Sequence, residues 1–167
     1  MRARVARRVL PLALLFVVGV GVAMAATMAA GGTVKAAKST KYGSLLVSST
    51  GMTLYHMTSE KAGSIKCTGG CAKFWPPLLF SGTGKPTAGS GVIALKLGTI
   101  KRPDGHLQVT YNRMALYRFA LDKKPGDVKG QGVEGIWFAV TPAGKLAKAS
   151  APASAATTTT SGGYGKG

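Results

Sequence analysis

The segment LYHMTSEKAGSIKCTGGCAKFWPP, residues 54–77, is one half of an internal duplication and contains both cysteines of the chain. Its landmarks return after 62 positions: there are two Leu-Tyr pairs, and each tyrosine precedes one of the two tryptophans by twenty residues. An acidic residue follows each tyrosine five positions on. These landmarks are Tyr55, Glu60 and Trp75 in the first copy and Tyr117, Asp122 and Trp137 in the second.

Further identities at the same offset extend the duplication over both flanks. With the Leu-Tyr pair and the tryptophan they make ten identities in forty positions without a gap. Two copies are too few for a solenoid, which needs three or more repeats to bury its faces. We therefore predict two pseudosymmetric halves around one core, repeat 1 at 43–82 and repeat 2 at 105–144. The other identities are Gly43, Leu45, Val47, Met52, Lys61, Gly70 and Gly82, matched by Gly105, Leu107, Val109, Met114, Lys123, Gly132 and Gly144.

Alternation of apolar and polar residues predicts a mainly β fold, a small single domain of two β-meander repeats. A Gly-containing turn at 49–51 separates two alternating stretches, which is typical of a hairpin. A Pro-Asp-Gly turn at 103–105 separates 97–101 from 106–111, and the chain can turn again at 112–113 into 114–119, giving a meander. A last strand is expected at 136–140. No segment has a sustained helical period.

The N-terminal residues 1–30 look like an export segment. Arg2, Arg4, Arg7 and Arg8 precede an almost continuously apolar run, and small residues at 23–26 offer a cleavage site. The alternative is an uncleaved anchor formed by residues 9–30, which approach the length that a transmembrane helix needs. Either reading places the rest of the chain outside the cytoplasm. We expect the helix of this segment to be followed by a tether at 31–41, a duplicated β-domain at 42–147 and a disordered Ala/Thr/Ser/Gly tail at 148–167.

The chain is strongly basic, with a formal net charge of +17 that falls to about +13 without the four N-terminal arginines. Outside the cell such a charge favours anionic wall polymers or membrane surfaces as partners. A solvated, lysine-rich surface that only keeps the protein soluble is the alternative. The lysines are scattered and no nucleic-acid-binding motif is present, so no specific nucleic acid is expected, and no small-molecule substrate is identified.

Cys67 and Cys71 are the only cysteines, and an even number in an exported domain favours a disulfide. So small a ring contributes about 2 kcal/mol on the loop-entropy model. The alternative is a soft-metal or redox site in which the two thiolates are joined by His56, Met57 or Met52. Thiolate and thioether ligands suit copper(I), which makes an exported copper protein the second reading. The second copy has Lys129 and Val133 at the cysteine positions, which argues against it.

The tyrosine and acid of each copy could be catalytic or structural. Catalysis needs such groups beside a nucleophile, a metal or a second acid, and the copies share no histidine because His56 corresponds to Arg118. The structural reading is that the acid caps turn N–H groups while the tyrosine packs with its hydroxyl bonded. We therefore predict no catalytic residues and no enzymatic activity. His106, beside a turn, is expected to be exposed.

Taken together, these residues give the chain a pattern that resembles a bacterial secreted-repeat family, often described as predicted lipoproteins, whose hallmark is a Tyr-x4-Asp motif. The resemblance covers about residues 43–144. It rests on Tyr55, Tyr117 and Asp122, with Glu60 replacing the aspartate of the first motif, and on the runs at 67–77 and 124–137. It implies a secreted or envelope location and no established activity. No cysteine lies near the end of the apolar segment, so this chain is not expected to be lipidated.

These observations lead to a functional hypothesis and one alternative. The chain is expected to be an exported, envelope-associated, non-enzymatic binding or structural module with a basic surface and no cofactor. The alternative is an exported copper-binding or redox protein that uses the Cys-x3-Cys loop.

Overall fold

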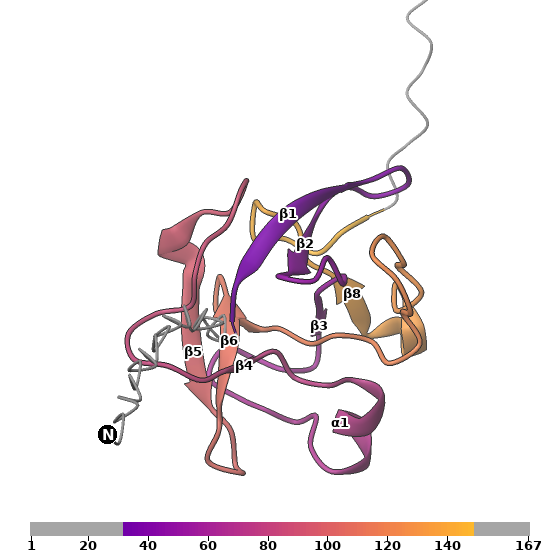
Figure 1. Ribbon diagram of the computed structural model, residues 1–167. Helices are drawn as coiled ribbons and strands as arrows, with labels where there is room; N and C mark the ends of the chain where they lie inside the picture. The colour runs from indigo at the N-terminus through magenta and orange to yellow at the C-terminus, as the bar shows by residue number, and fades with distance from the viewer. Residues whose placement is uncertain (1–31, 149–167) are drawn as a thin grey trace, which may run out of the picture.

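The computed structural model describes residues 32–148, in which short strands predominate and the helices are short (Figure 1). The predicted export segment at 1–30, and the predicted tail from residue 149 on, lie outside these residues. The mainly β prediction is confirmed. The strands are β1 (Val34–Ser39), β2 (Gly43–Ser48), β3 (Tyr55–Met57), β4 (Leu79–Phe80), β5 (Leu97–Lys101), β6 (Leu107–Tyr111), β7 (Met114–Ala115) and β8 (Trp137–Ala139); the helices are α1 (Gly70–Phe74), η1 (Ala94–Lys96) and η2 (Val133–Gly135).

The prediction of an irregular tether at 31–41 is wrong, because β1 occupies most of it. Val34 to Ser39 pairs antiparallel with β2, and Val34 is completely buried. The opposite edge of β1 is covered by residues 87–90, which exchange backbone hydrogen bonds with it. Alanines and lysines make a weak strand signal, and tertiary pairing overrides it. The duplication could have predicted this strand, because at the offset of 62, residues 35–39 correspond to the strand expected at 97–101.

Repeat 2 forms the meander that the sequence predicts. β5 pairs with β6, and β6 pairs with β7. The first turn is closed by a hydrogen bond from Gly105 N–H to the carbonyl of Arg102, 3.0 Å long. The second is a two-residue turn in which Asn112 and Arg113 have φ values of 50° and 65°. Positive φ at both central residues gives a turn whose twist suits a hairpin.

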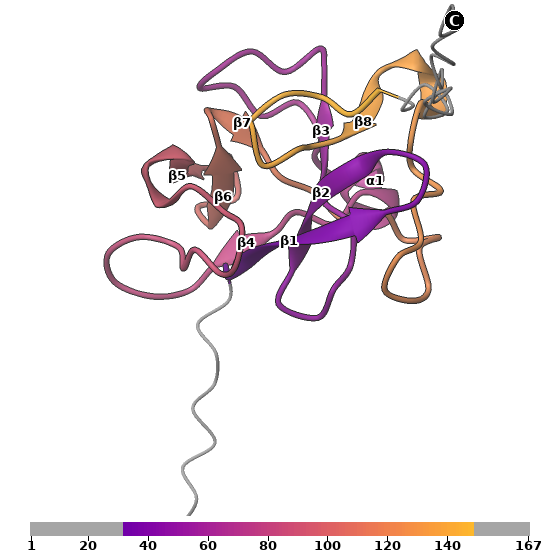
Figure 2. The same cartoon turned by 90° about the horizontal axis from the view of Figure 1, so that it is seen from above.

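The two repeats exchange their tryptophan-containing segments. β3 of repeat 1 pairs antiparallel with β8 of repeat 2, with Tyr55 opposite Ala139. The equivalent pairing joins Tyr117 to Pro77 of repeat 1, and Arg118 N–H donates to the carbonyl of Pro76 at 2.9 Å. Because the two prolines have no N–H to donate, this second pairing is reduced to an isolated bridge. In both views β3 and β8 lie on the opposite side of the molecule from β5 and β6 (Figures 1 and 2).

The Leu-Tyr pairs sit between two hydrophobic clusters. Leu54 and Leu116 belong to an aliphatic cluster with Leu46, Val109 and Val140. The tyrosines point to the other face and belong to an aromatic cluster with both tryptophans. Successive side chains on a strand point to opposite faces, so one dipeptide contributes to both clusters. This explains why leucine and tyrosine recur together in each copy.

The segment before the two prolines forms the short helix α1, after which the chain turns toward the protein interior. α1 ends where Trp75 N–H donates to the carbonyl of Cys71, and Trp75 is then buried while Phe74 stays largely exposed. The following prolines prevent the helix from continuing. Trp75 therefore packs inward and Phe74 does not.

We predict that Gly130→Ala destabilises the fold by about 1–3 kcal/mol, the range for forcing extra atoms into a packed core. A Cβ at Gly130 would lie 2.9 Å from the rings of both Trp75 and Tyr55. Urea denaturation followed by tryptophan fluorescence measures the change. Gly70→Ala is the matched control, because a Cβ there meets nothing within 4 Å. This second substitution should raise stability slightly by restricting the unfolded chain. Equal effects of the two substitutions would contradict this account.

Candidate functional site

The tyrosine and the acid of one copy do not bond each other. Each forms a hydrogen bond with its counterpart in the other copy. Tyr55 donates its hydroxyl hydrogen to Asp122 Oδ2 at 2.7 Å, and Tyr117 donates to Glu60 Oε1 at 2.8 Å. Each tyrosine therefore bonds the acid of the other repeat. All four residues are buried. Burial of charged groups is tolerated only where they are hydrogen-bonded in this way.

Each acid also organises the loop that follows it. Glu60 Oε1 accepts hydrogen bonds from the backbone N–H groups of Lys66 and Cys67, at 2.7 and 3.0 Å. Asp122 Oδ1 accepts from the N–H of Lys129 at 2.9 Å, the position equivalent to Cys67. The carboxylates thus fix the loops between tyrosine and tryptophan in both copies, as acids at turns commonly do.

The longer side chain of Glu60 performs the role of the aspartate with one oxygen only. Tyr117 and both backbone donors converge on Oε1, whereas Asp122 divides its partners between its two oxygens. Oε2 of Glu60 is buried and is the one enclosed side-chain nitrogen or oxygen atom in residues 32–148 that has no hydrogen-bond partner. The extra methylene therefore preserves the bond between the repeats and leaves the second oxygen unused.

The two tyrosines meet at the pseudosymmetry axis. Tyr55 N–H donates to the carbonyl of Tyr117 at 2.8 Å, and Tyr117 N–H donates to the carbonyl of Tyr55 at 2.9 Å. Trp75 and Trp137 stack face to face beside them, 3.8 Å apart and 5° from parallel. Each tyrosine ring meets the tryptophan of its own repeat edge-on, at 5.5 and 5.2 Å. Such arrangements contribute about 0.5–1.5 kcal/mol per pair beyond burial.

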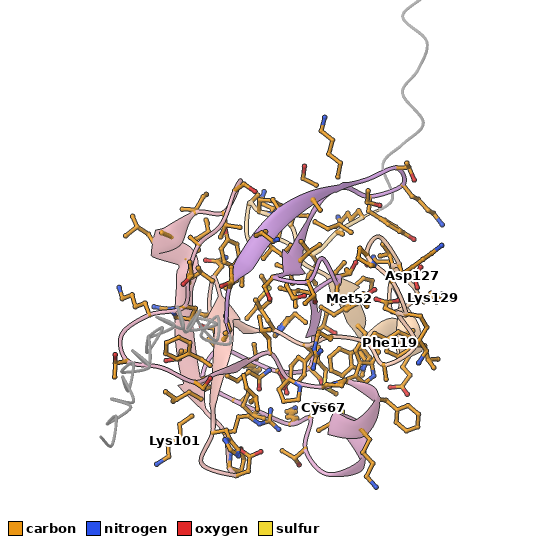
Figure 3. All side chains as sticks on the ribbon, viewed as in Figure 1. Met52, Cys67, Lys101, Phe119, Asp127 and Lys129 are labelled. Carbon is orange, nitrogen blue, oxygen red and sulfur yellow. A yellow bond between two sulfur atoms is a disulfide. The ribbon has the colours of Figure 1, made fainter. Side chains whose placement is uncertain are left out.

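Phe119 extends the stack on one side. Its ring lies 4.2 Å from that of Trp75 and 26° from parallel. The equivalent residue of repeat 1 is Met57, which packs on the same cluster. Figure 3 shows Phe119 among closely packed side chains, between α1 and the loop that contains Asp127 and Lys129. The pseudosymmetry of the aromatic cluster is broken at this position.

Burial dominates the electrostatics of the site. Burial and the neighbouring carboxylates raise the pKa values of the Tyr55 and Tyr117 hydroxyls well above the usual range for tyrosine. The hydroxyls therefore stay protonated and serve as donors. Burial also raises the pKa of Asp122, opposed by the hydrogen bonds from Tyr55 and Lys129. The two hydroxyl protons therefore stay in the hydrogen bonds between the tyrosines and the acids.

Cys67 and Cys71 are joined in a disulfide, which confirms the favoured sequence prediction. His56 is buried, and its Nδ1 donates to the carbonyl of Ala115 at 3.1 Å. Within residues 32–148, no three His, Cys, Asp or Glu side chains are grouped so that they could hold a metal ion. With both sulfurs bonded to each other, the copper alternative built on Cys67, Cys71, His56 and Met57 gains no support from this arrangement.

The family model for a secreted repeat of unknown function matches the chain twice, at residues 36–79 and 98–141. The two matches cover more than half of the chain and are offset by the same 62 positions as the duplication. The chain belongs to this secreted-repeat family. The matches begin upstream of the repeats predicted at 43–82 and 105–144, so each family repeat includes most of the opening strand of its hairpin, β1 or β5.

Membership in a secreted-repeat family supports export of the protein. Neither the comparison with curated proteins nor that with solved structures found a match. Within the described part of the chain, no helix has the length and apolar character required to span a bilayer. The predicted export segment at 1–30 and its cleavage lie outside these residues, and the absence of lipidation stays a prediction.

One buried residue next to the site was missed in the sequence. Arg102, which directly precedes the predicted Pro-Asp-Gly turn, is 3% exposed and donates from its guanidinium to Gln108 Oε1 and to the carbonyl of Cys67. It also pairs with Asp104 at 3.1 Å. The arginine thereby ties the disulfide loop of repeat 1 to the hairpin of repeat 2. An arginine in a Pro-Asp-Gly turn carries no local signal for such a role, whereas His106 in the same turn is exposed as expected.

We predict that the hydroxyl–carboxylate bonds couple energetically between the repeats. Tyr55→Phe leaves the Asp122 carboxylate and the Gly130 N–H short of a buried partner. The substitution should therefore cost about 1–3 kcal/mol of unfolding free energy. In a double-mutant cycle with Asp122→Asn, the two effects should be non-additive by about 1 kcal/mol or more. Chemical denaturation of the four proteins measures this.

The matched control for that cycle uses the acid of the same repeat. Tyr55→Phe combined with Glu60→Gln should show the smaller coupling, because Glu60 bonds Tyr117. A larger coupling within one repeat than between the repeats would contradict the exchange.

We predict that protonation of His56 destabilises the fold in mild acid. Burial lowers its pKa below the ordinary value, so the unfolded chain takes up this proton at a higher pH than the folded protein. Its contribution to stability is present above about pH 6.5 and is lost as the pH falls through the folded pKa. Unfolding free energies measured across this window should fall more steeply for the wild type than for His56→Gln. The exposed His106 provides the control, and a His106→Gln protein that flattened the curve instead would refute the assignment.

Proposed function

We propose that this member of the secreted-repeat family is a non-enzymatic module of the cell envelope that binds anionic wall polymer or an anionic membrane surface. The observation that carries the proposal is the placement of its charges. All five acids, and all but five of the 22 lysines and arginines, fall within residues 32–148. Two of the acids, Glu60 and Asp122, are buried in the exchange between the repeats, while Arg102 is the one buried lysine or arginine of this part of the chain.

Burial of the acids makes the surface more basic than the sequence suggests. Only Asp104, Asp127 and Glu134 remain to offset the surface cations. Within the described residues, ion pairs engage two cations, Arg102 with Asp104 and Lys129 with Asp127. The other lysines and arginines of this part of the chain are therefore available to an external anion. A field of this kind attracts anionic polymers and surfaces without a shaped pocket.

The motif residues support a structural role for the site within this proposal. The tyrosines and acids are buried, and their hydrogen-bonding groups are used to join the repeats and order their loops. Catalysis needs a reactive group that can meet its substrate. The cluster supports a rigid scaffold for the basic surface, with the chemistry of binding supplied by lysines.

The expected behaviour is binding that depends strongly on salt. The purified chain should be retained on glycerol-phosphate polymer, and on vesicles that contain anionic phospholipid, at about 0.15 M salt, and released at about 1 M, where the screening length falls from about 8 to about 3 Å. Vesicles of neutral lipid are the control for apolar attachment. Replacing Lys35, Lys38 and Lys41 by glutamine should weaken retention and reduce its salt dependence. Retention that does not change with salt would overturn the proposal.

A further inference from the structure

A cleft opens beside the stacked tryptophans, and the buried exchange between the repeats does not account for it. Its volume is about 360 Å³. This lies at the lower end of the range of small-molecule sites. Carbon and sulfur make most of its walls, and its lining includes Met57, Phe74, Trp75, Phe119, Glu134 and Trp137. Phe74 stands at this cleft with 62% of its surface exposed, so an aromatic face is open to a ligand there.

The two tryptophans that line this cleft have indole N–H groups for which the described part of the chain offers no acceptor. Trp75 is 4% exposed and Trp137 is 1% exposed, yet neither indole N–H donates a hydrogen bond to any residue between 32 and 148. Neither nitrogen is completely enclosed either, since in that part of the chain only Glu60 Oε2 is both enclosed and unpartnered. A buried tryptophan usually finds an acceptor for its N–H. Both tryptophans line the cleft, which makes their N–H groups the candidate donors to a ligand bound there.

Glu134 gives the cleft its only titratable side chain among the lining residues. Its backbone is held in the left-handed region, at φ 52° and ψ 14°. That conformation is unfavourable for any residue except glycine, asparagine or aspartate. Glycines with positive φ flank it at 132 and 135. Strain of this kind tends to collect at binding and switch sites. A carboxylate at this wall disfavours an anionic ligand, and the positive net charge of the protein disfavours a cation.

We propose that this cleft binds an uncharged, planar, conjugated ring that carries a carbonyl oxygen. The aromatic and thioether walls remove the ring from water, and the indole N–H groups donate to the carbonyl. The ligand is a planar ring because most of the lining side chains are aromatic and Phe74 is largely exposed for stacking. It is uncharged because Glu134 disfavours an anion and the positive net charge of the protein disfavours a cation. This site is separate from the basic surface, so it works whether or not the protein binds an anionic polymer.

The test uses the fact that the chain has two tryptophans and that both line the cleft. A ¹⁵N-labelled protein therefore gives two indole N–H signals, and each reports on the site. Chromone, an uncharged planar bicyclic ketone, should shift both signals in a saturable titration. Naphthalene, which has no acceptor, should bind about 5-fold or more weakly, the equivalent of a net hydrogen bond of about 1 kcal/mol. Chromone-2-carboxylate should also bind more weakly than chromone.

Variants assign the binding to the cleft. Phe74→Ala removes an exposed wall and should weaken chromone binding several-fold, whereas Leu95→Ala, at a side chain 93% exposed that does not line the cleft, should leave it unchanged. Glu134→Gln should bring chromone-2-carboxylate closer to chromone in affinity. The proposal is overturned if chromone moves neither indole signal, if naphthalene binds as tightly as chromone, or if Leu95→Ala weakens binding as much as Phe74→Ala.

Discussion

The structure depends on a pair of hydrogen bonds that cross between the repeats. Tyr55 bonds Asp122 and Tyr117 bonds Glu60, in the protein interior and next to the backbone bridge that joins the two tyrosines. A buried carboxylate without donors would cost far more than it contributes, so neither half can bury its acid alone. Each copy therefore supplies the donor of one bond and the acceptor of the other, and neither bond can form without the second copy.

The tryptophan-containing segments are also exchanged between the repeats. Each crosses to pair with the tyrosine strand of the opposite repeat, and this brings the two indoles face to face at the centre. Repetition of Leu-Tyr and of tryptophan at a fixed distance then has a physical cause. The leucine fills one cluster and the tyrosine the other, while the loop between tyrosine and tryptophan must be of one length to close the stack.

The sequence revealed the β class, the repeat 2 meander and the disulfide, because hairpin turns and cysteine parity are local signals. It did not reveal β1, whose alanines and lysines take strand form only through pairing with β2 and residues 87–90. The crossing of the tyrosine bonds was also beyond it. The five-residue spacing of tyrosine and acid is the same whether a tyrosine bonds the acid of its own repeat or that of the other repeat. Only the tertiary structure distinguishes these two arrangements. Arg102 was hidden for the same reason, since one of its partners is distant in the chain.

The exchange of strands and hydrogen bonds has a consequence for how such a domain could arise. An isolated single copy would carry a tyrosine without its acid, an acid without its tyrosine and a tryptophan segment without a strand to pair with. Two identical copies meeting about a two-fold axis would satisfy every one of these needs at once. The present chain has the architecture of such a homodimer whose subunits have been joined end to end, with Glu60 against Asp122 and the Pro76–Pro77 pair against Phe138–Ala139 recording how far the halves have since diverged.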